Sequence, residues 1–395
     1  MPLGIYISIP FCRTKCSYCN FASDVFSRVV FERYVDRVCA DIENAPQVAA
    51  EMGGRMERDV DSIYLGGGTP TVLETAQLER IFGAVRRQFD VASDAEVTVE
   101  CAPGTLTDAM LESLLRCSVN RVSLGVQSFV DEEAAAVGRL HKRATVLKDI
   151  SRLRAAGIAN INIDLIAGLP HQTAESWEFS LLETIATGAQ HVSVYMLEVD
   201  EDSRLGSELL AGGKRYHAHF VPEENMIADL YLAACERLNS ADIAQYEISN
   251  FACAGFESRH NLKYWTRQPY FGFGVDAHSM LRSATPDDEA VRFAPPDSLE
   301  KYMSGPDLMR TSVSRRAAVE ESFFLGLRLT RGVNLSELSA EFGQAVVGNA
   351  RPVIAELAEG GFVEILGDWI CLTPRGRLLS NEVFERFILV DEISR

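Results

Sequence analysis

Three cysteines lie close together near the N-terminus, at a spacing that suits a metal centre. Cys12, Cys16 and Cys19 form the pattern C-x3-C-x2-C, and three thiolates in one loop can occupy three corners of a cubane iron–sulfur cluster. Zinc usually takes a fourth Cys or His at short spacing, but the next candidate, Cys39, lies in a predicted helix. Three buried or merely reactive thiols are the alternative. The spacing favours an iron–sulfur cluster whose open iron can chelate a substrate and pass it an electron.

The residues before the cysteines predict the element that carries them. Ile5, Ile7 and Ile9 alternate with more polar residues, which is typical of a strand, and we expect this strand to end at Pro10. Because strand-like and helix-length stretches then alternate, we predict the α/β class, with six parallel strands in a partial (β/α)6 barrel. The further strands are expected at 62–65, 96–100, 121–126, 160–166 and 191–197, and helices at 75–89, 107–116, 142–156 and 174–187.

Polar and glycine-rich residues stand at the carboxyl ends of these strands, where β/α barrels bind their ligands. The second strand ends in three glycines followed by Thr69, and open amides there would suit a carboxylate or an amine. Glu100, Gln127 and Asp164 end the next three strands, and Arg139 lies in a following loop. One such residue is usually a solvated cap. Three at successive strand ends favour a binding site.

A segment rich in His, Tyr, Trp and Gly follows the sixth strand. His260, Tyr264 and Trp265 lie in one string, and His278 comes further on. A neutral imidazole is a good iron ligand and aromatic rings can stack on a macrocycle, so the segment suits a planar ligand with a metal centre. A packed aromatic loop is an equal alternative, since most His and Trp are structural.

Proline- and aspartate-rich residues at 284–298 predict a domain boundary. We expect a barrel domain at 1–285 and a C-terminal helical, winged-helix-like domain at 296–395. Residues 300–395 hold 11 basic and 14 acidic residues, a net charge of 11 − 14 = −3. This balance favours a packing or partner-contact role over DNA binding.

Composition excludes several classes of protein. The 395 residues include 38 Lys+Arg and 56 Asp+Glu, a formal net charge of −18, and this acidic excess argues against a large nucleic-acid surface. No uncharged apolar run approaches the roughly 18 residues of a membrane span. Nine cysteines are an odd number, in a chain whose start lacks a signal-peptide pattern. We therefore expect a soluble, cytoplasmic protein without a disulfide framework.

Several strings read together resemble one superfamily. The loop IYISIPFCRTKCSYCNF resembles the radical S-adenosylmethionine (SAM) superfamily. The strings YLGGGTP, RVSLGVQSF, GRLH, NIDLIAGLP, YEISNF and SRHNLKYW add a resemblance to the oxygen-independent coproporphyrinogen oxidase family, and HNxxYW at 260–265 resembles its HemW-type branch of heme chaperones. The true oxidases carry a further cysteine where this chain has Phe21. An asparagine usual in the family is replaced by Ala102.

The resemblance implies a [4Fe-4S] cluster, SAM and heme as ligands. Cys12, Cys16 and Cys19 would ligate the cluster, which cleaves SAM reductively in this superfamily, and Tyr6 and Tyr18 would lie beside cluster and cofactor. The implied SAM contacts are Gly67, Gly68, Thr69, Glu100, Gln127, Arg139 and Asp164. The implied heme region is His260, Tyr264 and Trp265, with His278 ranked lower. Heme carboxylates would need local cations such as Arg139 or Arg259 in so acidic a chain.

The function implied by the resemblance is that of a heme chaperone, which hands heme to an acceptor such as a respiratory heme protein. Cluster and SAM would then regulate transfer, through dimerisation for example, and the acceptor would provide any peripheral membrane contact. The enzymatic alternative is a radical SAM oxidoreductase like the coproporphyrinogen III dehydrogenases, or a related methyltransferase. A cluster protein without radical chemistry is a third reading, but it leaves the polar strand ends unexplained.

Overall fold

One curved sheet carries all six of the predicted parallel strands. The structure is a computed structural model that describes residues 1–201, 203–305 and 307–388. The six strands are neighbours in sequence order, and each pairs in parallel with the next. This confirms the predicted partial barrel. The strands are β1 (Leu3–Ile9), β3 (Asp59–Gly67), β4 (Asp90–Cys101), β5 (Arg121–Gln127), β6 (Asn160–Ala167) and β7 (His191–Met196).

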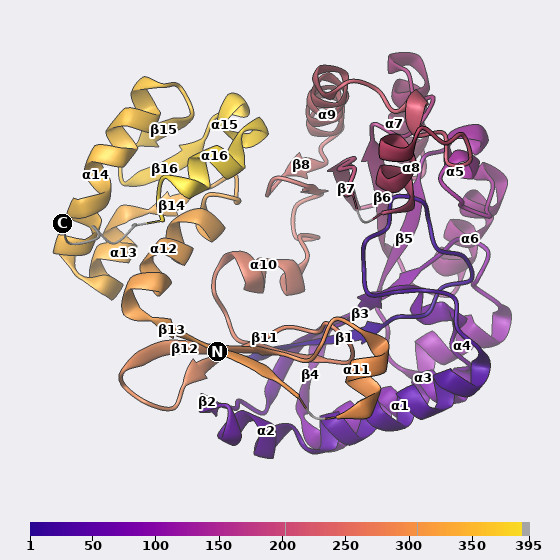
Figure 1. The fold of residues 1–395 in the computed structure, drawn as a ribbon, viewed down its shortest axis with the longest axis horizontal. Coiled ribbons are helices and arrows are strands. Elements are labelled where there is room, and N and C mark those ends of the chain that lie inside the picture. Colours follow the sequence, from indigo (N-terminus) through magenta and orange to yellow (C-terminus); the bar gives the residue numbers. More distant parts are fainter. Residues whose placement is uncertain (202, 306, 389–395) are drawn as a thin grey trace.

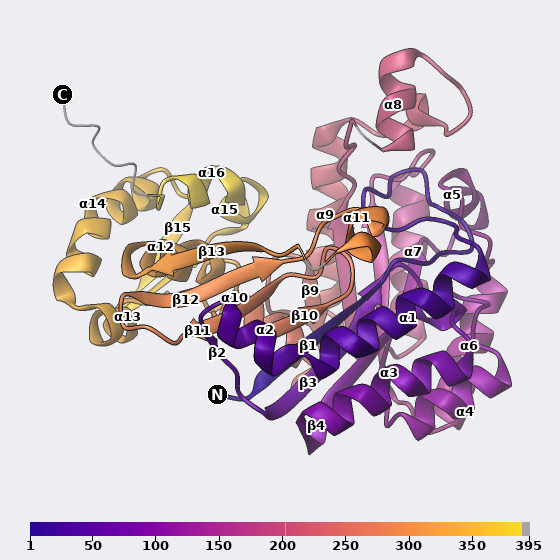
Figure 2. The same cartoon turned by 60° about the horizontal axis from the view of Figure 1, so that its bottom comes forward.

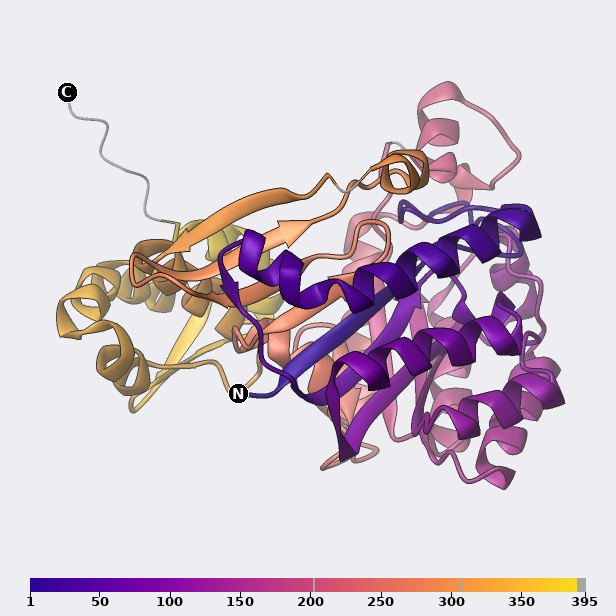
Figure 3. The same cartoon turned by 90° about the horizontal axis from the view of Figure 1, so that it is seen from below.

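Helices between the strands cover the outer face of the sheet (Figure 1, Figure 3). Each parallel crossover needs such a connection, and its apolar face packs on the strands. Buried residues of the first helix and of the strands form one continuous core. The covering helices are α1 (Arg28–Glu43), α3 (Thr75–Gln88), α4 (Asp108–Arg116), α6 (Arg143–Ala155) and α7 (Ala174–Ala186).

The sheet does not close into a full barrel. Beyond β7 it continues antiparallel through β9 (Asn250–Ala252) to β8 (Ala244–Gln245), and beyond β1 it continues through β10 (Tyr270–Phe273). Helix α10 (Arg259–Trp265) lies on the concave side (Figure 1). The string that suggested a loop at 260–265 is therefore a short helix.

The strands after β10 link the barrel to the C-terminal region. β11 (Ser279–Ser283), β12 (Asp288–Ala294) and β13 (Met309–Ser314) extend the same sheet, so pairing continues past residue 285. Figure 2 shows β12 and β13 side by side next to the C-terminal helices, and the two strands run in opposite directions. The division at 285–296 stays a prediction.

The C-terminal region combines helices with a small hairpin, as a winged-helix-like unit does. Its core also takes in residues from the ends of the large sheet, including Met280, Ala290 and Val313. The helix at Gln344–Glu359 continues through Pro352, and Leu379 separates the last two helices. The elements are α12 (Arg315–Gly326), β14 (Val333–Asn334), α13 (Leu335–Phe342), α14 (Gln344–Glu359), β15 (Val363–Leu366), β16 (Trp369–Leu372), α15 (Pro374–Leu378) and α16 (Ser380–Glu385).

Further α-helices and strands complete the described part of the chain. They are α2 (Ala45–Glu51), β2 (Gly54–Arg55), α5 (Asp131–Ala136), α8 (Arg204–Ala211), α9 (Glu224–Asn239) and α11 (Leu299–Ser304). In the described ranges, no helix combines the length and the apolar character that crossing a bilayer requires.

A buried tyrosine on α1 ties the first strand to its neighbour. The hydroxyl of Tyr34 donates to the Ser8 carbonyl (2.7 Å) and accepts from the Val275 amide (3.0 Å). Its ring meets that of Phe11 edge-on, with centroids 5.1 Å apart. One side chain therefore holds α1, the end of β1 and the second residue after β10 together.

We expect Tyr34→Phe to lower the free energy of unfolding by about 1–3 kcal/mol, because it leaves a buried carbonyl and a buried amide without a partner. Urea unfolding of the apoprotein measures this. Tyr216→Phe is the matched control, since the hydroxyl of Tyr216 forms no hydrogen bond with a described residue. Equal effects of the two substitutions would show that the shared hydroxyl is not important.

Candidate functional site

The three clustered cysteines lie in a closed loop that begins where β1 ends. The loop closes through backbone hydrogen bonds, Cys12 N–H to the Asp24 carbonyl and Asp24 N–H to the Pro10 carbonyl, both 3.0 Å. On its outer side Ser17 N–H donates to the Val137 carbonyl (3.2 Å). Ser17 in turn accepts from Leu205 N–H of α8 (2.8 Å). The loop is thus held by the strand, by the segment after α5 and by α8.

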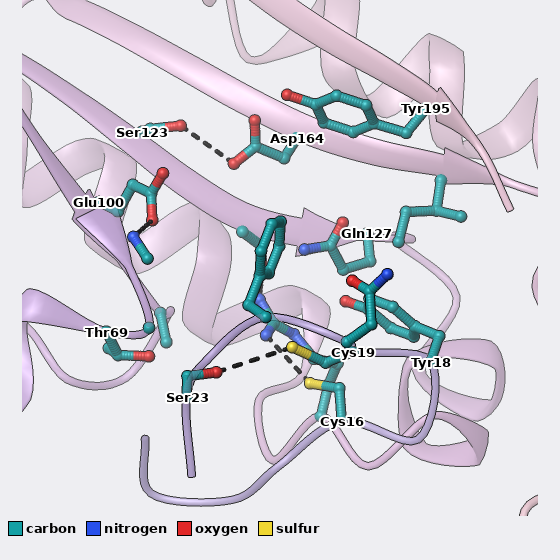
Figure 4. A pocket seen from close by; sticks show the side chains of 18 of the residues that line it. Cys16, Tyr18, Cys19, Ser23, Thr69, Glu100, Ser123, Gln127, Asp164 and Tyr195 are labelled. Atoms are coloured by element: carbon teal, nitrogen blue, oxygen red, sulfur yellow. Dashed lines mark hydrogen bonds between the residues drawn. The ribbon is translucent and has the colours of Figure 1, made fainter. Parts of the chain in front are cut away.

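All three thiols are free and line one cavity of about 640 Å³, here called the central cavity. Polar groups face each sulfur: Thr69 Oγ1 lies 3.8 Å from Cys12 Sγ, and Arg139 Nη1 lies 3.4 Å from Cys16 Sγ. Ser23 Oγ lies 3.7 Å from Cys19 Sγ (Figure 4). Burial raises the pKa of the Cys12 thiol, and the charges of the other two cysteines add to this. The three sulfurs therefore lie near enough to interact electrostatically.

The donor set fits an iron–sulfur cluster better than a single metal ion. No three His, Cys, Asp or Glu side chains of the described residues are arranged around one ion position. A cubane cluster requires a different arrangement of ligands, because each thiolate binds a separate iron. The protein has this arrangement, because three free thiols line one cavity. Each thiol also has a hydrogen-bond donor nearby that can stabilise a thiolate.

Two partly buried carboxylates face the same cavity from the strand ends. Glu100 accepts hydrogen bonds from the Tyr64 hydroxyl (2.9 Å) and the Gly67 amide (3.1 Å), and Asp164 accepts from Ser123 Oγ (3.0 Å) (Figure 4). Burial, with the neighbouring Asp164 charge, raises the pKa of Glu100 from 4.5 to about 7. Burial also raises the pKa of Asp164. This pair lowers its electrostatic energy when a cation binds between or beside the carboxylates.

Gln127 and Arg139 add the remaining polar groups expected at the strand ends. Gln127 has a left-handed backbone (φ 68°) at a register shift in β5, and its buried Oε1 has no hydrogen-bond partner among the described residues. Such a strained, unpartnered group is typical of a ligand site. Arg139 donates to the Gly125 carbonyl as well as to Cys16. Its guanidinium thus joins the cysteine loop to the end of β5.

The glycine run differs from its expected role. The Gly68 amide donates to the Ile9 carbonyl and the Thr69 amide to the Phe11 carbonyl, both 2.8 Å, while the Gly67 amide binds Glu100. None of these amides is open to a ligand. A Cβ at Gly68 would lie 2.7 Å from the Ile9 carbonyl oxygen. The glycine is required because two backbone segments approach closely.

The two tyrosines expected beside the cofactors lie in different places relative to the central cavity. Tyr18 lines the central cavity, but Tyr6 does not. The Tyr6 ring lies behind the cavity wall, with its centroid 6.2 Å from that of Tyr64 and 6.4 Å from the His260 ring. Its position makes it a supporting residue and not a wall residue.

The candidate heme residues lie on α10, outside the lining of the central cavity. His260 is 1% exposed, with Nδ1 3.1 Å from Ser62 Oγ and Nε2 2.8 Å from the Tyr264 hydroxyl. Burial lowers its pKa to about 3, and the charge of Lys263 adds to this, so the ring is neutral. Both ring nitrogens are occupied. The second candidate iron ligand, His278, is exposed and lies beside Asp276.

The central cavity also has walls that no sequence pattern indicated. One wall comes from the last parallel strand and the region before β9, and another from the C-terminal unit. Tyr195 and Met196 lie at the end of a predicted strand. Their position at a strand end could have indicated that they line the cavity. The C-terminal residues come together only through tertiary packing. The additional lining residues include Tyr195, Met196, Leu197, Ile248, Arg328, Arg377, Leu378, Ser380 and Asn381.

Comparisons with known proteins agree over the whole chain. The model of the radical SAM superfamily matches residues 6–182, and that of the HemN C-terminal domain matches 313–379. The chain is 35% identical to the heme chaperone HemW of Bacillus subtilis, over 97% of this chain and 98% of that protein. It is 30% identical to the heme chaperone HemW of Escherichia coli, over 98% of each.

A solved structure shows the same fold. The coproporphyrinogen III oxidase HemN of Escherichia coli, a radical SAM enzyme, matches with a TM-score of 0.82 and 24% identity, over 98% of this chain and 90% of that one. The predicted fold class and resemblance are thereby confirmed.

We expect Glu100→Gln to change how the stability of the apoprotein depends on pH. The folded-state pKa of about 7 lies above the ordinary 4.5, so the folded chain holds an extra proton between these values. Wild-type stability should therefore be fully present below about pH 4.5 and fall as the pH rises through about 7. The variant, which never ionises, should be more stable than wild type by about 1–3 kcal/mol at pH 8, and by much less at pH 5.

Urea unfolding at the two pH values tests this, with Glu359→Gln at an exposed helix end as the control. A difference between Glu100→Gln and wild type that is the same at both pH values would contradict the assignment of a raised pKa.

Proposed function

Because the chain belongs to the radical SAM superfamily and, within it, to the HemW family of heme chaperones, we propose that it binds heme and transfers it to an acceptor protein. A [4Fe-4S] cluster and SAM occupy the central cavity in this proposal. The observation that carries it is the joining of three free thiols and the strand-end polar groups in one cavity. The similarity to named heme chaperones extends over nearly the full length.

In this proposal Cys12, Cys16 and Cys19 hold the cluster. When bound, the cluster supplies an electron to a ligand at its open iron. The protein's part is to keep three thiolates in place, and the donors from Thr69 and Arg139 favour the ionised sulfurs. Burial excludes water from the Cys16 side of the loop.

SAM is proposed to bind between the cysteine loop and the strand ends. It carries a sulfonium and an ammonium group, and the carboxylates of Glu100 and Asp164 are the groups that would attract them. Gln127 offers an unpartnered amide oxygen. Gly67, Gly68 and Thr69 shape the wall, and their amides are not available. Arg139 is proposed to contact the cofactor beside Cys16. Tyr18 is proposed as a wall contact, with Tyr6 behind it.

Heme is proposed to bind near α10, with His260 as the candidate iron ligand and Tyr264 and Trp265 beside it. The geometry sets a condition, because Nε2 must leave the Tyr264 hydroxyl before it can bind iron. The low pKa of the ring favours ligation, since a neutral imidazole is the ligating form.

The acceptor is proposed to be a heme protein, for example a respiratory one, met in the cytoplasm or at a membrane surface. Homodimer formation is a further part of the proposal. A radical SAM oxidoreductase that acts on coproporphyrinogen III, or a related methyltransferase, is the alternative that the experiments must separate from it.

We expect Cys16→Ala to abolish the brown absorbance of the protein after anaerobic reconstitution with iron and sulfide, because a cubane cluster with two cysteine ligands is poorly held. Cys39→Ala is the matched control, since Cys39 lies on α1 and does not line the central cavity. Iron and sulfide analysis with the visible spectrum measures both variants. An unchanged cluster content in Cys16→Ala would rule out its role as a ligand.

We expect near-stoichiometric heme to give a new Soret band with the reconstituted wild type, and His260→Ala to lose it. Tyr264→Phe is the informative partner, because it frees Nε2 and keeps the ring, so heme binding should be kept or strengthened. Retained cluster absorbance shows that each variant is folded. Heme uptake by His260→Ala equal to that of wild type would remove His260 from the proposal. Coproporphyrinogen turnover without heme uptake would favour the enzyme instead.

A further inference from the structure

The wall of the central cavity contributed by the C-terminal unit carries two arginines. Arg328 follows α12, and Arg377 lies on α15. Ser380 and Asn381 of the next helix line the same cavity. The cysteine loop and the strand-end carboxylates belong to the barrel. The barrel thus supplies the thiols together with both acidic and basic lining residues, whereas the charged lining residues of the C-terminal unit are the two arginines.

Arg328 is held in place by stacking, and the charge of Glu247 acts on it. Its guanidinium lies over the Trp265 ring, 4.3 Å from the centroid. It forms neither an ion pair nor a hydrogen bond with any residue in the described ranges, and Nε is buried without a partner. Glu247 is the carboxylate whose charge acts on it. Oε1 of Glu247 accepts a hydrogen bond from Asn250, and the buried Oε2 has no hydrogen-bond partner among the described residues. A half-buried guanidinium with unmet donors is suited to a carboxylate ligand.

Arg377 has spare donors as well. Nη1 donates to the Leu372 carbonyl (3.0 Å), which fixes the side chain, and within the described part of the chain it forms no ion pair. The other arginines considered for heme carboxylates are already engaged. Arg139 binds Cys16 and the Gly125 carbonyl, and Arg259 pairs with Asp94 outside the central cavity.

Apolar side chains line the same cavity as the two arginines and suit a flat apolar ring. They include Tyr195, Met196, Leu197 and Ile248. Heme combines a planar apolar macrocycle with two carboxylates on one edge, so it matches an apolar wall that adjoins two arginines.

We propose that Arg328 and Arg377 bind the propionate carboxylates of heme, and that Trp265 is a positioning residue that holds the Arg328 guanidinium at the cavity wall. This inference rests on the proposed function and adds to it where the carboxylate edge of the heme lies. It also gives the tryptophan of the HNxxYW string a role that does not involve the iron.

Titration of the reconstituted protein with heme and with heme dimethyl ester, followed at the Soret band, tests the inference. The ester keeps the macrocycle and iron but lacks both charges. Wild type should bind heme more tightly than the ester. Arg328→Gln and Arg377→Gln should each weaken heme binding about tenfold or more and leave ester binding nearly unchanged, because a charge-assisted contact is lost only with heme.

Arg375→Gln is the matched control. Arg375 lies on the same helix as Arg377 and stacks on Phe362 at 4.6 Å, but it does not line the central cavity. Trp265→Leu should reduce the preference for heme over the ester, and Trp265→Phe should restore most of it, because only an aromatic ring can stack on the guanidinium. Cluster absorbance reports whether each variant is folded.

The outcomes of these titrations distinguish failure of the propionate site from failure of the proposed heme chaperone function. Wild type that binds heme and its ester equally well, or Arg328→Gln and Arg377→Gln that keep the wild-type preference, would overturn the propionate site and leave the heme chaperone intact. Wild type that binds neither compound would overturn the proposed function, and the inference with it.

Discussion

The backbone pairing of Gly68 and Thr69 with Ile9 and Phe11 is the contact on which the candidate site depends. The two amides donate to the two carbonyls at the point where β1 gives way to the cysteine loop. A side chain at Gly68 would separate these segments, because its Cβ would lie 2.7 Å from the Ile9 oxygen and 2.8 Å from that of Phe11. The glycine run therefore fixes the base of the cysteine loop to the sheet. The loop's remaining contacts, with Val137 and with α8, only complete a position already set.

A second constraint is the charge inside the central cavity. Glu100 and Asp164 are brought together, and burial raises the pKa of each carboxylate. The charge of Arg121 lowers the pKa of Asp164, and Arg139 donates to Cys16 and to a backbone carbonyl. Neither arginine forms an ion pair with the two carboxylates, so both carboxylates can interact with a cationic ligand. On the C-terminal wall, Arg328 and Arg377 form no ion pair with a described residue. The chain as a whole is acidic, with a net charge of −18, so two arginines without an ion pair at a cavity wall are unusual in it.

Much of the fold and part of the site follow from local patterns. The six strands follow from the apolar runs, and polar residues at strand ends meet because parallel strands share one edge. Glu100, Gln127 and Asp164 do line one cavity. The glycine amides were expected to be open, and this was wrong because a neighbouring strand end uses them. That pairing is tertiary, so no local pattern shows it. The burial of His260 against Ser62 is equally long-range, since it joins residues 198 positions apart.

Helix α10 shows why the HNxxYW string is more than a set of iron ligands. Its two faces contact different parts of the protein. His260 packs toward β3 through Ser62 and Tyr64, and buried Lys263 pairs with Asp61 (2.7 Å). Trp265, at the other end, lies under the guanidinium of Arg328 beyond α12. A helix of seven residues thus joins the inner face of the barrel to the basic wall of the cavity. Movement of His260 toward iron would disturb the same helix that holds Arg328, so ligation of the metal and binding of the propionates would share one structural element.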